Sequence, residues 1–353
     1  MTFYPLPTPQ AVQNATDLIA REVLHTPVRT SAVLSDLTTS NLDGLDTELF
    51  FKCENFQHTG SFKFRGAMHF LARLPNHELL KGIVAYSTGN HALAVARAAQ
   101  ILSKERHIEI PTFVVVPQDC SPIKVSAAKH YGATILFCEP EPEARKHLAQ
   151  KLAKRIGAVV VPPADHENIA LGQATLVREF LDQVHETGVS LDAVIVPSGG
   201  GGLLVGAIAA CKPSNTLVFG AEPILGGPGL RRAMEVGVRA TTLTPSDTMA
   251  DGLRSLTGEA NFEIIKRRDN VNGIFSVSED QIRDSLRLVV NELGFVVEPS
   301  AAVPLAVALF SPEFKDKLKD ESMKRRKEKV RIGIVLTGSN ITEEDLATIL
   351  PDL

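Results

Sequence analysis

The chain alternates short, almost purely apolar runs rich in valine and isoleucine with longer segments in which apolar residues recur every three or four positions. The short runs fit strands that are buried on both faces, and the longer segments fit amphipathic helices. Three strand-then-helix pairs follow one another: 82–86 with 90–102, 112–116 with 121–130, and 133–138 with 141–156. This alternation predicts an α/β protein with largely parallel sheets.

The same pattern extends over the rest of the chain. It predicts a helix over 11–24 and a strand over 48–53, then strands at 158–161, 193–196, 217–220 and 330–336 and helices at 167–185, 203–210, 281–293 and 301–309. A chain of 353 residues is longer than the roughly 250–300 residues at which single cores stop growing. Because no internal repeat or low-complexity linker separates the segments, we expect two interleaved lobes, each an open, largely parallel sheet flanked by helices.

Composition and charge exclude several classes of function. The net charge is −4, and the basic run over 315–331 is interrupted by acidic residues, which is typical of a solvated helix face and not of a nucleic-acid partner. No apolar run reaches the roughly 18 residues of a membrane-spanning helix, and no secretory signal pattern is present. The four cysteines lack the spacing of a zinc site or a disulfide framework. We therefore expect a cytoplasmic protein with no membrane or nucleic-acid partner.

One lysine lies between two phenylalanines at the predicted start of a helix, in the sequence Ser-Phe-Lys-Phe-Arg-Gly-Ala over 61–67. Gly60 and Ser61 are expected to form the turn and N-cap that place Lys63 in the first helical turn. A lysine in apolar surroundings loses hydration of its ammonium form, so its pKa falls and its free amine can form an imine. The alternative is a solvated charge on an amphipathic helix.

Three of the predicted strands end in loops whose residues could bind a ligand or take part in a reaction. These loops lie at the edge where open parallel sheets bind ligands. The loop Ser-Thr-Gly-Asn-His over 87–91 gathers polar groups at a helix N-terminus, which suits a carboxylate or simply caps the helix. Ser198 is followed by four glycines, whose N–H groups can surround a phosphate. The nucleotide motifs that would extend such a loop are absent. The loop Thr-Gly-Ser-Asn over 337–340 offers a hydroxyl donor.

Taken in this order, the four motifs resemble the pyridoxal-phosphate enzymes of the tryptophan-synthase-β fold (fold type II), and within them the serine racemase and serine/threonine dehydratase family. The resemblance covers nearly the whole chain, with further matching segments at 115–118, 131–133, 172–173, 221–223, 250–252 and 298–301. It implies pyridoxal 5'-phosphate as cofactor, an amino-acid substrate and a homodimer. It also implies a large cofactor-binding lobe over 1–72 and 162–353, and a small mobile substrate-binding lobe over 73–161.

The resemblance assigns roles to individual residues. Lys63 is expected to bond covalently to the cofactor and to act as the catalytic base, with Phe62 beside the ring. The remaining cofactor contacts are Asn90 at the ring hydroxyl, Thr337 at the ring nitrogen, and Gly199, Gly200, Gly201 and Gly202 at the phosphate. The substrate contacts are Ser87, Thr88, Gly89, Asn90 and His91 for its carboxylate, together with Arg145 and Ser255.

The implied reaction removes the β-hydroxyl group of L-serine, L-threonine or 3-hydroxyaspartate and yields a keto acid and ammonia. Racemisation needs a proton donor on the opposite face of the substrate, which in the racemases is a serine at the position of Thr88. Threonine adds a methyl group and a stiffer χ1, so the sequence favours an ammonia-lyase with side racemase activity. A serine or aspartate racemase and a pyridoxal-phosphate-binding protein without turnover are the alternatives.

A divalent cation site of the family is incomplete in this sequence. Relatives use a glutamate, a backbone carbonyl and an aspartate six residues after the glutamate. Glu222 and Gly226 match the first two, but Pro228 stands in place of the aspartate. Because Mg²⁺ and Ca²⁺ prefer carboxylate ligands, the sequence favours loss of the metal.

Overall fold

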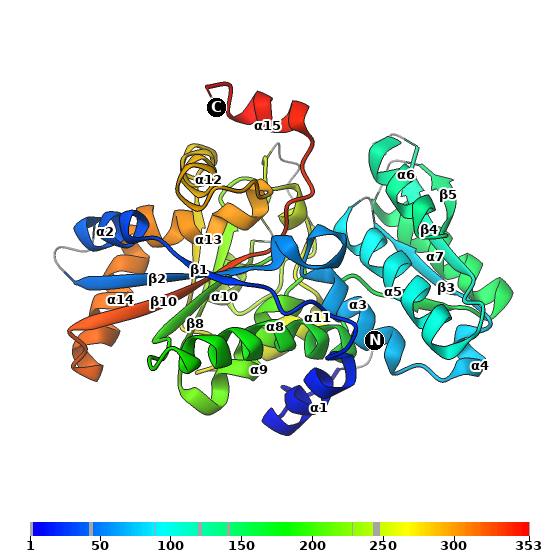
Figure 1. Ribbon diagram of the computed structural model, residues 1–353, viewed down its shortest axis with the longest axis horizontal. Coiled ribbons are helices and arrows are strands. Elements are labelled where there is room, and N and C mark those ends of the chain that lie inside the picture. The colour runs from blue at the N-terminus through cyan, green and yellow to red at the C-terminus, as the bar shows by residue number, and fades with distance from the viewer. Residues whose placement is uncertain are drawn as a thin grey trace.

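The computed structural model of the protein describes residues 3–41, 45–87, 89–118, 122–139, 142–227, 229–242 and 248–352. Within these ranges the strands form one sheet of six and one of four, and helices lie on both faces of each sheet (Figure 1). The prediction of an α/β fold with two open, largely parallel sheets is confirmed.

The larger sheet is built from both ends of the chain. Its strands, in spatial order, are β1 (Val28–Thr30), β2 (Asp46–Cys53), β10 (Lys329–Leu336), β7 (Ala193–Pro197), β8 (Leu217–Pro223) and β9 (Gly273–Val277). Only the pairing of β1 with β2 is antiparallel. The central position of β10, the last strand of the chain, brings the loop after residue 336 to the middle of the sheet edge where ligands bind.

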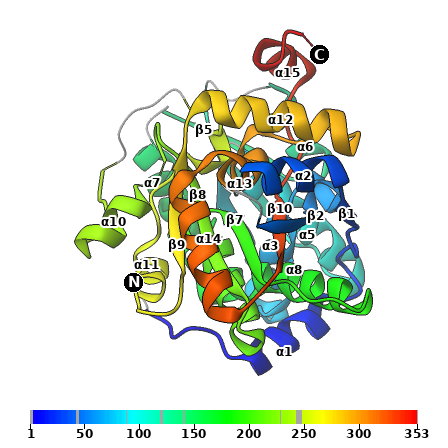
Figure 2. The ribbon, with the colours of Figure 1, turned by 90° about the vertical axis from the view of Figure 1, so that its left-hand side faces the viewer.

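Two helical layers cover this sheet (Figure 2). One face packs against α2 (Ala32–Asn41), α12 (Glu279–Leu293), α13 (Pro299–Phe310) and α14 (Pro312–Arg325). The other face packs against α8 (Glu167–Glu186) and α9 (Gly202–Cys211), with α1 (Pro9–Ile19) outside them. Alternate residues of β7 serve the two layers, since Ile195 faces the first and Val194 the second. Continuous apolar strands follow from this two-sided burial.

The smaller sheet is entirely parallel and is formed by one stretch of the chain. Its strands lie in the order β5 (Thr134–Cys138), β4 (Thr112–Pro117), β3 (Ile83–Tyr86) and β6 (Val159–Val161). The helices of this stretch are α4 (Asn76–Leu79), α5 (Asn90–Arg106), α6 (Pro122–His130) and α7 (Pro142–Ile156). The chain therefore leaves the larger sheet after β2, builds the smaller one and returns. The predicted lobe boundaries at 72 and 162 stay predictions.

Some elements differ from the sequence pattern. α1 ends at Ile19, not near Leu24, because the backbone N–H and carbonyl of Leu24 bind the side chain of Gln57 and leave the helix. The pattern also missed β1, α2 and β9, and the short helices α10 (Leu230–Val236), α11 (Glu259–Ile265) and α15 (Glu343–Ile349). Each of the missed strands lies at an edge of the larger sheet, where the apolar signal is weaker.

A buried group of four charges holds α3 (Lys63–Ala72) to the larger sheet. Arg65 donates two hydrogen bonds of 2.8 Å to Glu54, which directly follows β2, and one of 2.9 Å to Glu179 on α8. Lys52 donates 2.5 Å and 2.8 Å hydrogen bonds to Glu179 and to the Thr26 carbonyl. Removing one partner of a buried ion pair leaves an uncompensated charge, which costs about 3–5 kcal/mol. The position of α3 is thus strongly fixed.

Glycines let α3 approach α8 backbone to backbone. A Cβ atom added to Gly172 on α8 would lie 2.5 Å from the Arg65 carbonyl oxygen and 2.6 Å from the Gly66 Cα. The opposing Gly66 has the same limit, since its Cβ would lie 2.3 Å from the Gln173 amide. A Cβ atom at either glycine would therefore collide with the facing helix.

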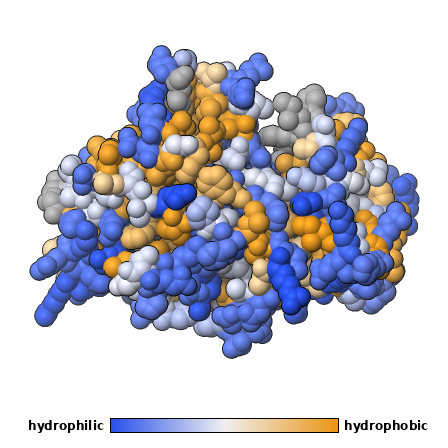
Figure 3. Space-filling view, viewed as in Figure 1, coloured by the Kyte–Doolittle hydropathy of each residue, from blue (hydrophilic) through white to orange (hydrophobic). Residues whose placement is uncertain are grey.

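The described surface has both polar and apolar areas. Figure 3 shows a hydrophilic lower edge and an apolar area in the upper middle of the view, and exposed apolar side chains include Phe56, Phe137 and Ile224. Homodimer formation stays a prediction. Among the described helices, none has the length and apolarity that crossing a bilayer requires.

We predict that Gly172→Ala lowers the free energy of unfolding of the apoprotein by about 1–3 kcal/mol, because the added methyl group overpacks the contact of α3 with α8. Urea unfolding followed by circular dichroism measures the change. Glu186→Ala, at an exposed position of the same helix, is the matched control and should change stability by less than about 0.5 kcal/mol. Equal stability of Gly172→Ala and wild type would show that the contact of α3 with α8 has room for the added methyl group.

Candidate active site

The start of α3 is joined to the loop that follows β10. Ser61 and Gly338 form an isolated antiparallel bridge, in which the Phe62 N–H donates to the Thr337 carbonyl at 3.0 Å. The prediction that Ser61 caps the helix with its side chain is wrong: the N-cap residue is Phe62, without a side-chain cap, and the Ser61 hydroxyl is buried without a partner in the described chain. The bridge holds the segment in an extended conformation instead and places Lys63 first in the helix.

Lys63 is half-buried as a whole residue. It donates a 2.9 Å hydrogen bond to the Pro163 carbonyl and lies 5.1 Å from the centre of the Phe62 ring. Burial lowers the pKa of Lys63 to about 8, and the negative charge of Glu298 opposes part of this decrease. A considerable fraction of the amine is therefore neutral near neutral pH, as imine formation requires.

Asn90 connects the two sheets across the site. Its amide donates to both carboxylate oxygens of Glu298, at 3.1 and 2.9 Å, and accepts a 2.7 Å hydrogen bond from Asn340. Glu298 precedes α13, and its N–H donates to the Gly338 carbonyl at 2.9 Å. The first residue of α5 is thus tied to the loop after β10, where buried Thr337 also lies.

The loop before α5 leaves N–H groups available for an anion. The Ser87 hydroxyl accepts a hydrogen bond of 3.2 Å from the Gly89 N–H, and the first N–H groups of a helix have no acceptor within the helix. His91 is buried and donates through Nε2 to the Val161 carbonyl at 3.0 Å. Burial and the nearby Lys63 lower the pKa of His91 to about 3, so His91 is neutral and contributes no positive charge. Thr88 lies outside the described residues.

The glycine run forms the turn from β7 into α9. Added Cβ atoms on Gly200 and Gly202 would lie 2.5 Å from the Ala164 Cβ and 2.9 Å from the Ala164 carbonyl oxygen. Gly201 has a φ of +89°, in the left-handed region that favours glycine. Alanine at these positions would collide with neighbours, so the run is required by close approach and backbone conformation.

These surroundings fit pyridoxal phosphate. Gly199 to Gly202 and the start of α9 offer backbone N–H groups to a phosphate, and the buried hydroxyl of Ser198, which has no partner in the described chain, directly precedes them. Lys63 offers the amine, and its acceptor Pro163 is adjacent to Ala164, which contacts the glycine run. The amine and the phosphate-binding candidates are therefore neighbours.

The remaining predicted substrate residues differ in their positions. Ser255 lies beside the glycine run, because a Cβ on Gly199 would be 3.0 Å from its hydroxyl oxygen. Arg145 lies on α7 and, within the described chain, has no hydrogen bond or ion pair to the residues of this site. Arg254, the neighbour of Ser255, donates to the Thr248 carbonyl.

Glu222 uses its carboxylate to hold a helix start. Its oxygens accept hydrogen bonds from the Leu230 and Arg231 N–H groups at 3.0 and 3.1 Å and from the Ser276 hydroxyl at 3.4 Å. Burial raises the pKa of this carboxyl. In the described part of the chain, no group of three His, Cys, Asp or Glu side chains could hold a metal ion. Gly226 is described, whereas Pro228 is not.

Sequence reasoning missed the positions of Glu298, Asn340 and Pro163. In the sequence, Glu298 was noted only as part of a matching segment. It follows an apolar segment and directly precedes a helix that begins with proline, and an acidic residue in that position could have indicated a role in the site. Pro163 acts through its carbonyl oxygen, which any residue carries, so no side-chain pattern could reveal it.

The comparisons with known proteins agree with the motifs. The family model described as "Pyridoxal-phosphate dependent enzyme" matches residues 19–338. The chain is 34% identical to a serine racemase of Dictyostelium discoideum, over 96% of each chain, and 35% identical to an L-threo-3-hydroxyaspartate ammonia-lyase of Saccharomyces cerevisiae, over 98% of this chain and 97% of the relative.

A solved structure of maize serine racemase superposes with a TM-score of 0.85 at 32% identity, covering 98% of this chain and 97% of the maize protein. A fold likeness of this extent leaves no large part of either chain unmatched. Lys63, the glycine run, the family model and these relatives agree with one another. The chain therefore belongs to the pyridoxal-phosphate-dependent enzymes of the serine racemase, hydroxyaspartate ammonia-lyase and threonine deaminase family.

Proposed function

We propose that this enzyme is an ammonia-lyase that removes the β-hydroxyl group of an L-amino acid, with L-serine, L-threonine and L-threo-3-hydroxyaspartate as candidate substrates. The observation that carries the proposal is the amine of Lys63, which lies near the glycine run and whose pKa is lowered to about 8. In the sequence, Thr88 stands in place of the racemases' serine. The hydroxyaspartate ammonia-lyases among its relatives support the same choice.

Lys63 has two tasks in this proposal. Its amine would hold the cofactor, and its Nζ would accept the α-proton of the substrate. Pyridoxal phosphate, when bound, supplies an electron sink for the negative charge left at the α-carbon. The Pro163 carbonyl directs the lysine nitrogen through their 2.9 Å hydrogen bond, and Phe62 would lie beside the ring.

The other residues orient the reactants. Gly199 to Gly202 would hold the phosphate, and Asn90, whose amide is fixed by Glu298 and Asn340, would contact the ring hydroxyl. Thr337 would meet the ring nitrogen with a neutral hydroxyl, which provides no ionic partner. The loop over 87–91 would hold the substrate carboxylate with backbone N–H groups.

The alternative is a serine or aspartate racemase, because several relatives carry the name serine racemase. The two activities differ in whether a proton is returned from the side opposite Lys63. Arg145 and Ser255 remain candidates for contacts that select the substrate side chain. A second carboxylate, as in 3-hydroxyaspartate, would suit an arginine in this position.

We predict that the purified enzyme converts these L-amino acids into keto acid and ammonia faster than into D-enantiomer. Incubation with L-serine, L-threonine and L-threo-3-hydroxyaspartate, with assays for both products, ranks the activities and the substrates. Lys63→Ala gives the baseline and should lack the cofactor's absorption band. Thr88→Ser should raise D-product formation, because the smaller side chain removes the methyl group. Predominant D-product from wild type would make the enzyme a racemase, and absence of both products would favour a protein without turnover.

We predict that the rate at which the apoprotein captures pyridoxal phosphate rises about tenfold per pH unit below pH 8 and levels off above it, because only neutral Lys63 reacts. Stopped-flow absorbance measures this rate. The negative charge of Glu298 raises the pKa of Lys63, so Glu298→Gln should shift the profile to lower pH. An inflection near 10, as for an exposed lysine, would contradict the burial of this amine.

We predict that a chelator changes turnover by less than about twofold, because Glu222 is occupied by backbone donors and Pro228 supplies no carboxylate. Turnover before and after EDTA treatment and gel filtration tests this expectation. Loss of activity that Mg²⁺ or Ca²⁺ restores would show that the enzyme retains a functional cation site.

A further inference from the structure

Asn261, the third residue of α11, lies against the glycine run and is fully buried. Its Nδ2 group donates to the Gly200 carbonyl at 2.8 Å and to the Ala164 carbonyl at 3.3 Å. Its backbone N–H donates to Asp165 at 2.9 Å. A Cβ on Gly201 would lie 3.0 Å from the Asn261 Cβ, so the side chain packs directly under the loop.

The remaining polar atom of Asn261 is bound by the N-terminal segment. The Tyr4 hydroxyl donates to Asn261 Oδ1, although Tyr4 lies before α1, far from α11 in sequence. Both ribbon views place the start of the described chain, before α1, near α11 (Figures 1 and 2). Burial, together with the charge of Asp165, raises the pKa of Tyr4, so the hydroxyl keeps the proton that it donates.

The Tyr4 hydrogen bond supports the one orientation of the Asn261 amide that the Gly200 carbonyl permits. A carbonyl oxygen can only accept, so Nδ2 must face Gly200, and Oδ1 must then face the tyrosine hydroxyl. Without that donor, Oδ1 is a buried acceptor with no partner in the described chain, which favours movement of the amide away from the loop.

The orientation of the Gly200 carbonyl determines where the next N–H points. The peptide group is planar and trans, so the Gly200 carbonyl and the Gly201 N–H point in opposite directions. The Gly200 carbonyl, which also accepts a 3.0 Å hydrogen bond from the Gly258 N–H at the start of α11, is held toward α11 and therefore aims the Gly201 N–H to the opposite side of the loop. In the proposed site, this N–H would donate to the cofactor phosphate.

We propose that Tyr4 is a positioning residue for the cofactor phosphate, which acts through Asn261 on the peptide group between Gly200 and Gly201. The N-terminal segment thereby becomes part of the cofactor site without touching the cofactor. This inference rests on the proposed assignment of the phosphate to the glycine run.

Tyr4→Phe tests the inference by the affinity of the apoprotein for two ligands. Pyridoxal phosphate carries the phosphate, and pyridoxal has the same ring and aldehyde without it. Equilibrium titration followed by absorbance should show about a tenfold weaker affinity for pyridoxal phosphate, as expected for one lost buried hydrogen bond, and an unchanged affinity for pyridoxal. The phosphorus NMR signal of the bound cofactor should shift as well.

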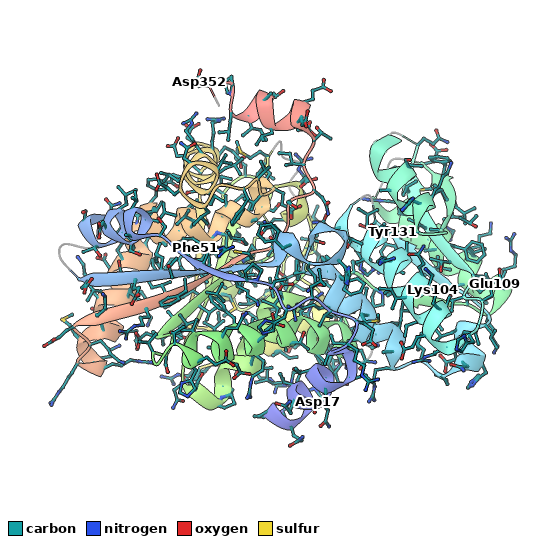
Figure 4. The ribbon with its side chains drawn as sticks, in the orientation of Figure 1. Asp17, Phe51, Lys104, Glu109, Tyr131 and Asp352 are labelled. Carbon is teal, nitrogen blue, oxygen red and sulfur yellow. The ribbon has the colours of Figure 1, made fainter. Side chains whose placement is uncertain are left out.

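Tyr131→Phe is the matched control. Tyr131 lies directly after α6, on the part of the chain that builds the smaller sheet (Figure 4), and its replacement should leave both affinities unchanged. Asn261→Asp, which removes the Nδ2 donor, should weaken pyridoxal phosphate selectively. Because Tyr4 acts through Asn261, the double variant should lose no more affinity than Asn261→Asp alone.

Each outcome decides a different statement. Unchanged affinity of Tyr4→Phe for pyridoxal phosphate, an equal loss for both ligands, or full additivity of the two substitutions would overturn the role of Tyr4. If wild type bound pyridoxal as tightly as pyridoxal phosphate, the assignment of the glycine run to the phosphate would fail, and the role of Tyr4 with it.

Discussion

The backbone pairing of Ser61 with Gly338 is the constraint on which the rest of the site depends. It fastens the start of α3 to the end of the central strand β10, with hydrogen bonds from Phe62 N–H to Thr337 and from Ser339 N–H to Gly60, both of 3.0 Å. A Cβ on Gly338 would lie 3.0 Å from Glu298 Oε1. The absence of a side chain at Gly338 therefore leaves room for the Glu298 carboxylate beside the paired backbones. Backbone hydrogen bonds therefore join the three segments that carry Lys63, Thr337 and Glu298.

Two cations on the same helix illustrate how burial acts in opposite ways. Arg65 is surrounded by Glu54 and Glu179, and these carboxylates raise its pKa, so it stays charged although it is buried. For Lys63, two residues earlier, burial lowers the pKa by more than the negative charge of Glu298 raises it. The difference lies in the number of nearby carboxylates. A structural cation and a reactive amine can therefore follow each other closely in sequence.

The fold was largely predictable from local pattern, because strands buried on both faces leave a continuous apolar signature. The three strand-end loops were also predictable, because clusters of hydroxyls and glycines directly after apolar strands stand out in the sequence. Contacts between distant segments were not predictable. Ser61 has the composition of an N-cap but pairs with a residue near the other end of the chain, and Asn261 has no feature that indicates its bond to Tyr4. The interpretations of Thr88 and Pro228 stay predictions, because both lie outside the described residues.

The hydrogen bond from Lys63 to the Pro163 carbonyl has a further consequence. Pro163 follows β6, on the segment by which the chain returns from the smaller sheet to the larger one. The acceptor of the Lys63 amine is thus supplied by the chain's return from the smaller sheet and not by the helix that carries the lysine.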